Sequence, residues 1–371
     1  MAYFKLQFKK VIKSSLTWLI LSVVLLGAGL VLTYNAVSGD QSSIRTEVTR
    51  ELDRKKQVQP KLSGDNKQVK KDRAILTALN QRNWQLVYRM MIKRNREQVA
   101  RIKIGREKYR QATLQKNNRL QALLRANVPE EDEQRPKRGF LFLFKLLEGY
   151  LPALITVMLC FVLSNLFAAK YVDQLNRDNI LPRKNILALD LILGLLVASG
   201  LTLVVRLLIF GVSSLLFGPG SLAYPISGVM LPKPQAQYLP LSHWLAQTLS
   251  LTALVGIFIV FLILFLAQVT RNQLSCLFLA LVLLLGGAIL PLILQSASKE
   301  VGHLQTSIVR YLPSTYLFSA QVVTGKWGTN LEDPQINFAV GCQVLVSAIA
   351  VLAILNLVWP KVESRIVKHI N

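Results

Sequence analysis

Two ionisable side chains lie inside an apolar stretch, residues 186–208, that is long enough to cross a lipid bilayer as a helix. Asp190 stands near its beginning and Arg206 near its end. Charges inside a membrane are costly, and they usually line a polar cavity or pair with another helix. About 24 Å of helix separates the two, so they cannot pair with each other. Both are candidate pathway charges, unless each side chain reaches the nearer membrane face.

A second charged segment, residues 168–192, joins two apolar runs and mixes apolar with ionisable residues. A short amphipathic helix under the membrane would present its charges to a soluble partner. The alternative, a plain basic loop that only sets the topology, explains the same residues equally well. The candidates for contact with a partner are Asp173, Arg177, Arg183 and Lys184.

Catalytic motifs are missing from the sequence. It contains no glycine-rich P-loop for ATP phosphates, no HExxH zinc motif and no GxSxG nucleophile motif. The three histidines lie in segments that would not converge, and each of the three cysteines falls inside an apolar run. We therefore expect no catalytic, cofactor-binding or metal-binding residue on this chain, and we favour transport over enzymology.

The elements that must position these residues are six apolar runs of about 20 residues each, the length that spans a bilayer as a helix. In lipid, every backbone polar group must be paired within the segment, so such runs become helices. The first run is too long for a usual signal peptide and lacks a clear cleavage pattern. We expect an all-α membrane protein with one transmembrane helix before a large polar insertion and five after it. The runs are 15–34, 149–169, 186–208, 245–267, 274–294 and 338–359.

The orientation follows from Lys and Arg in the short connections, which are enriched on the cytoplasmic side of membranes. With both termini inside, the cytoplasmic segments carry twelve Lys and Arg residues, whereas the short outer connections carry four. The sequence therefore predicts a multi-pass protein of the cell membrane with cytoplasmic N- and C-termini. Residues 360–371 then form a cytoplasmic tail.

Residues 35–145 would lie outside, although this segment holds most of the chain's net charge of +24. Segments of this length cross membranes largely regardless of their charge. A thin apolar stripe with helical spacing predicts an extended helical hairpin or coiled coil. Its basic surface could attract an anionic partner or could simply keep a spacer soluble. Nucleic acid does not fit, because the segment would lie outside the cell and lacks a pattern of base-stacking aromatic residues. Residues 1–14 are predicted to form a basic amphipathic helix on the inner leaflet. The alternative is an unstructured basic flank that only sets the topology.

The layout and several short motifs resemble the ABC-2 type permease family, in particular bacterial exporters with a large extracellular insertion between the first two spans. The resemblance covers the whole chain as a layout. Residues 168–192 are similar to the family's first cytoplasmic loop, with Leu-Pro-Arg-Lys-Asn-Ile at 181–186. The best local match is Leu-Pro-Ser-Thr-Tyr at 312–316, followed by Val-Val-Thr-Gly at 322–325 and Asn-Phe at 337–338. Tyr-Pro-Ile at 224–226 is similar to an outer loop.

The resemblance implies several properties of the site and its partners. Residues 168–192 would couple to a separate ATP-binding subunit, which would hold ATP and Mg. A second permease subunit would complete a homo- or heterodimer. The segment with Pro313, Thr315, Tyr316 and Gly325 would re-enter the outer leaflet and cap the path. The family suggests efflux of an amphipathic, peptide-like or drug substrate. The alternatives are a membrane-anchored sensor and a cell-envelope assembly factor whose basic helical domain binds a partner.

Overall fold

The computed structural model describes residues 8–9, 11–38, 44–58, 67–101, 107–172, 186–230, 235–290, 293 and 308–370. Within these residues, six helices are long and apolar enough to cross a membrane, which confirms the expected helical membrane protein. The spanning segments are Ser15–Val37, Leu151–Ala168, Leu187–Phe217, Leu241–Thr270, Gln273–Leu290 and Phe338–Pro360. They belong to helices α2 (Ser15–Val37), α8 (Leu151–Val172), α9 (Ile186–Phe217), α10 (Leu241–Thr270), α11 (Gln273–Leu281) with its continuation, and α16 (Phe338–Ile370).

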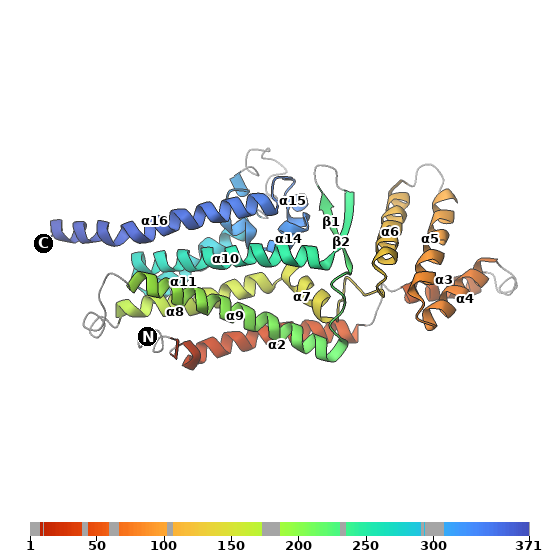
Figure 1. Cartoon of the computed structure of the whole chain (residues 1–371), viewed down its shortest axis with the longest axis horizontal. Coiled ribbons are helices and arrows are strands. Elements are labelled where there is room, and N and C mark those ends of the chain that lie inside the picture. The colour runs from red at the N-terminus through yellow and green to blue at the C-terminus, as the bar shows by residue number, and fades with distance from the viewer. Residues whose placement is uncertain are drawn as a thin grey trace.

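The spanning helices run along the longest axis of the molecule (Figure 1). The start of α2 and the end of α16 lie at one end of the bundle, which we call the terminal end. The helices between α2 and α7 lie at the opposite end, which we call the insertion end. An even number of crossings explains why the two chain ends share one end of the bundle.

Helix α10 is the centre of the bundle and packs against α8, α9, α11 and α16. Helix α8 is also well enclosed, whereas the outward faces of α2 and α11 carry exposed apolar side chains. Leu30 is 72% exposed and Leu274 is 75% exposed. Contact of such contiguous apolar surface with water is unfavourable in free energy, whereas contact with lipid tails is not.

The spanning segments match the predicted runs to within about four residues at each end, except at the end of α9. Helix α9 continues nine residues beyond 208 and ends at Phe217, because residues 209–217 are also largely apolar and a Gly-Pro-Gly turn at 218–220 follows them. A separate short helix, α7 (Gly139–Glu148), precedes α8 and was not among the predicted runs. The break falls at Gly149 and Tyr150, just before Pro152, which has no amide hydrogen to continue the ladder.

The described residues of the insertion fold into four helices, α3 (Ile44–Val58), α4 (Lys67–Asn80), α5 (Trp84–Arg101) and α6 (Glu107–Ala126). Each packs on the next along the chain. The apolar stripe predicted from the sequence is buried, with Val48, Val87 and Met91 fully enclosed. Arg94 lies among these helices and pairs with three carboxylates, Glu47 at 3.2 Å, Glu51 at 3.0 Å and Asp72 at 3.3 Å. These ion pairs connect α5 to α3 and α4.

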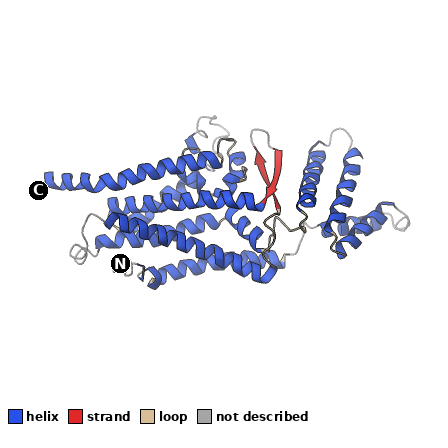
Figure 2. Cartoon of the chain, in the orientation of Figure 1, coloured by secondary structure: helices blue, strands red, loops and turns tan. Residues whose placement is uncertain are grey.

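A β-hairpin at the insertion end was not predicted. Strands β1 (Pro225–Met230) and β2 (Gln235–Pro240) pair antiparallel, with Ile226 opposite Leu239. Figure 2 shows the hairpin between the spanning helices and the insertion. The indole nitrogen of Trp244, on α10, donates to the Ile226 carbonyl at 3.1 Å. This contact fixes the hairpin to the end of α10.

Candidate functional site

A cap, which we define as residues 308–337, covers the insertion end of the bundle. It contains a 3₁₀ turn (Pro313–Leu317), α14 (Ser319–Val323) and α15 (Lys326–Asn330). Thr315 and Tyr316 are fully buried. The Thr315 hydroxyl donates to the Val309 carbonyl at 2.7 Å, and the Tyr316 hydroxyl donates to the Arg310 carbonyl at 2.7 Å. The residues that carried the sequence resemblance therefore hold the turn in place.

The 3₁₀ turn is set between helices. A β-carbon added to Gly341, on α16, would come within 2.7 Å of the Tyr316 ring and 3.2 Å of Leu251, on α10. A β-carbon at Gly287, in the continuation of α11, would meet the Ser314 hydroxyl at 2.5 Å. Leu251 lies about 15 Å from the start of α10 along the helix axis. The turn therefore lies beside α10, beyond the first turns of that helix. Its re-entry into a lipid leaflet stays a prediction.

Gly325 links the cap to the β-hairpin. Its φ of +72° is a left-handed conformation that glycine adopts without steric cost. The Val229 amide donates to the Thr324 carbonyl at 2.8 Å. A β-carbon at Gly325 would lie 2.0 Å from the Val229 carbonyl oxygen. Two independent constraints, the backbone angle and the close approach, therefore require glycine here.

Glu148, the last residue of α7, is the ionic centre of the cap. Its carboxylate accepts from Lys145 at 2.7 Å and from Lys326 at 2.6 Å, and the Thr324 hydroxyl lies at 3.5 Å. Its backbone carbonyl accepts from the Gln321 side chain. Burial raises the pKa of Glu148, but the two lysines outweigh burial, so the net pKa is lowered. The carboxylate is thus charged and connects α7 to α14 and α15.

A second polar cluster joins the insertion to the bundle. The Tyr224 hydroxyl donates to the Glu131 carbonyl at 2.9 Å and accepts from Arg119, on α6, at 3.2 Å. Arg119 also pairs with Glu133 at 3.1 Å, and Arg138 pairs with Glu131 at 3.2 Å. Burial raises the pKa of Tyr224, so its hydroxyl stays protonated and can donate. The sequence resemblance at 224–226 therefore falls on a residue of this junction.

Glu130, beside this junction, accepts from the Ile44 amide at 2.9 Å, at the first turn of α3. Burial raises its pKa to about 7, against the lowering effects of that hydrogen bond and of Arg119. Because the folded state binds this proton more tightly than the unfolded state does, the folded protein loses stability as the pH rises from about 4.5 to about 7. Glu130→Gln is expected to remove this loss and to stabilise the insertion by about 3 kcal/mol at pH 8.

The effect of Glu130→Gln is measured by urea unfolding of the full chain in detergent at pH 5 and pH 8. Proteolysis of the insertion reports how much of it has unfolded. We expect the variant and the wild type to differ at pH 8 and to converge at pH 5. Asp132→Asn, in the same turn, is the control. An equal pH dependence in wild type and Glu130→Gln would contradict the assignment.

The two candidate pathway charges do not share a face. Sixteen residues on α9 place Asp190 and Arg206 roughly 160° apart around the helix. Asp190 is buried at 4% exposure, whereas Arg206 is half-buried. This angle follows from the helical period alone, so it could have been predicted from the sequence.

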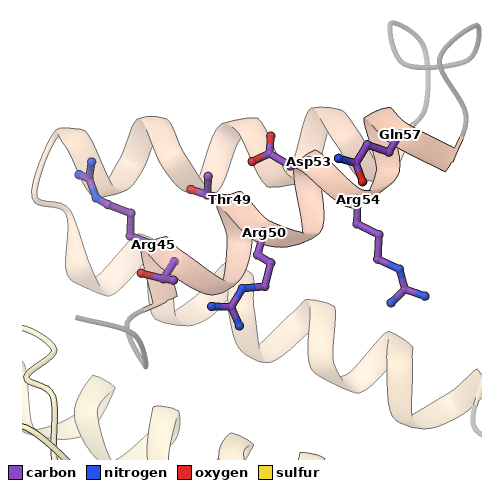
Figure 3. A pocket seen from close by; sticks show the side chains of 7 residues that line it. Arg45, Thr49, Arg50, Asp53, Arg54 and Gln57 are labelled. Atoms are coloured by element: carbon purple, nitrogen blue, oxygen red, sulfur yellow. The ribbon is translucent and has the colours of Figure 1, made fainter. Parts of the chain in front are cut away.

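The predicted coupling residues Asp173, Arg177, Arg183 and Lys184 lie outside the described residues. In the described part of the chain, no group of histidine, cysteine and acidic residues is placed to hold a metal ion. A shallow hollow of about 600 Å³ follows the exposed face of α3 and is lined by Arg45, Arg50, Asp53 and Arg54, among others. Figure 3 shows Arg50 and Arg54 pointing to one side and Arg45 to the other, so the guanidinium groups do not converge.

The fold and these contacts define a six-span helical membrane protein with a capped bundle end. Comparisons with protein-family models, curated proteins and solved structures find no match to this chain.

Proposed function

We propose that the chain is the membrane subunit of an ATP-driven exporter of the ABC-2 type, with ATP and Mg bound by a separate subunit. The observation that supports this most is the cap. The positions that resemble the family, Pro313, Thr315, Tyr316 and Gly325, gather at the bundle end opposite the chain termini. A structural role for each of Thr315, Tyr316 and Gly325 would explain why those residue types occur there.

A path for mechanical coupling supports the proposal. The proposed coupling segment joins α8 to α9, and α9 is a 32-residue helix that runs from the terminal end to the insertion end. There the Gly139 amide donates to the Gly218 carbonyl at 3.0 Å, and the Phe140 and Phe210 rings lie 4.6 Å apart. Gly139 begins α7, which ends at Glu148 and its lysines. Movement of the coupling segment would thus reach the cap through two rigid helices.

In this scheme both termini are cytoplasmic, the four-helix insertion is outside, and two permease subunits face two ATP-binding subunits. Closure of the ATPases would push the coupling segments and open the bundle beneath the cap. The substrate class suggested by the family is amphipathic or peptide-like.

The test is purification of the tagged chain from its native host. We expect a separate ATP-binding protein to co-purify and its ATP hydrolysis to rise in the complex. Charge reversal, Arg183→Glu with Lys184→Glu, is expected to reduce this stimulation at least tenfold, because the contact would lose its charge complementarity. Lys361→Glu with Arg365→Glu removes the same charge from the predicted tail and serves as the control. Normal hydrolysis and export in the 183/184 variant would refute the coupling assignment.

A binding role in the cell envelope is the second candidate, favoured by the charge on α3. Glu47 and Glu51 pair inward with Arg94, which leaves a basic outer face. Such a face favours anionic partners. Co-purification separates the two functions, because a binding component would be isolated with an envelope partner and without an ATPase.

A further inference from the structure

Arg206 places a guanidinium group well inside the spanning helix α9. Its Nε and Nη2 atoms are both buried, and neither has a hydrogen-bond partner among the described residues. An isolated charge removed from water is strongly unfavourable unless it is paired. The side chain as a whole is only half-buried, so part of it remains open to the surroundings of α9.

Neighbouring contacts fix the depth of Arg206. The Asn35 side chain, near the end of α2, donates to the Pro136 carbonyl at 2.9 Å, and Gly139 bonds to Gly218 just past α9. The insertion ends of α2 and α9 are therefore nearly level, and these helices are in contact. Arg206 lies about 18 Å below Gly218 along the helix axis. Helix α2 is about 34 Å long by the same measure, so Arg206 is level with its middle and too deep to reach either end.

The surroundings of Arg206 on α9 are amphipathic. Ser199, Thr202 and Ser213 lie at positions i−7, i−4 and i+7, on the same line along the helix as the arginine. On one side of this line Val205 and Ile209 are buried, and on the other side Leu203 and Leu207 are each 57% exposed. A narrow polar stripe thus follows the border between the packed face and the exposed apolar face.

We infer that Arg206 and the stripe form an intramembrane binding site for the anionic headgroup of a lipid-like amphiphile. The headgroup would lie on the open side of the guanidinium and would accept hydrogen bonds there and from Thr202, while the acyl chains would lie against Leu203 and Leu207. A charge-assisted bond of this kind is strong because it forms away from water. The inference does not depend on the ATPase partner. If the proposed export function is correct, the cargo is an acidic amphiphile.

The test uses the full chain in a non-ionic maltoside, titrated with phosphatidylglycerol and, separately, with zwitterionic phosphatidylcholine, with bound lipid counted by native mass spectrometry. We expect Arg206→Gln to weaken phosphatidylglycerol binding about tenfold, the effect of one lost charged hydrogen bond, with no change for phosphatidylcholine. Arg206→Lys is expected to stay within threefold of wild type. Arg271→Gln, which removes a guanidinium stacked on Tyr171 at the terminal end, is the matched control and should change neither affinity.

Arg206→Met guards against loss of folding, because it removes an unpaired buried charge and is expected to raise the melting temperature while losing the anionic lipid. Unchanged phosphatidylglycerol affinity in Arg206→Gln and Arg206→Met would overturn the inference. An equal loss in Arg271→Gln would also overturn it, since the lipid would then respond to charge in general. If Arg206→Gln instead dissociates a dimer and leaves lipid binding intact, an acidic residue of a second copy is the partner and the lipid site is refuted.

Discussion

Gly325→Ala is expected to destabilise the cap by about 3 kcal/mol, within the range of substitutions that combine backbone strain with a steric clash. The left-handed φ of +72° costs a residue with a side chain about 1 kcal/mol. The remainder comes from the Val229 carbonyl oxygen, only 2.0 Å from the new β-carbon. This neighbour is backbone, so it cannot move away without disturbing the adjacent hydrogen bond from the Val229 amide to Thr324.

Gly218→Ala is the matched control for Gly325→Ala. Gly218 has a similar φ of +86°, but a β-carbon there would meet nothing within 4 Å. We expect this variant to lose only about 1 kcal/mol, the cost of the backbone angle alone. Thermal unfolding in detergent and protease cleavage within residues 308–337 measure both variants. Equal losses in the two would show that the contact between Gly325 and Val229 has no energetic role.

Much of the membrane fold could be predicted from the sequence, because a bilayer imposes a length and a composition on each span. The element ends were harder to predict. Residues 209–217 remain apolar enough to extend α9, and hydropathy does not reveal the break between α7 and α8, since both pieces are apolar. The two strands of the β-hairpin show no alternating apolar pattern. They depend on contacts with Trp244, on the helix that follows, and with Thr324, which is remote in sequence.

The candidate site was predicted only in part, because some of its contacts join residues that are far apart in the sequence. Tyr316 and Gly325 belong to a compact motif whose residue types are required locally by a buried turn and a positive φ. Glu148 and Lys145 are three residues apart, so their pairing follows from helix geometry. Lys326 lies 178 residues further along the chain, and only the folded bundle brings it to Glu148. Long-range ion pairs leave no signal in local spacing.

Glu148→Gln is expected to destabilise the protein by about 2–3 kcal/mol at neutral pH, because the neutral amide leaves two partly buried lysines without their counter-charge. The carboxylate is 9% exposed, whereas Lys145 and Lys326 are 22% and 33% exposed, so water offsets part of the loss. Since the folded-state pKa of Glu148 is lowered, its contribution is complete above the unfolded pKa of about 4.5. It is lost as the pH falls through the folded-state value.

Glu97→Gln provides a surface comparison for Glu148→Gln. Glu97 pairs with Lys71 at 2.8 Å, but both side chains are 37% exposed, so we expect a loss below about 1 kcal/mol. Lys326→Met combined with Glu148→Gln completes a double-mutant cycle, and a coupling energy of at least 1 kcal/mol is expected for residues in direct contact. Urea unfolding at pH 7 and pH 4 measures the wild type, the two single variants, the double variant and Glu97→Gln. A coupling near zero, or a loss at Glu148 no larger than at Glu97, would mean that the contact between Glu148 and Lys326 does not stabilise the cap.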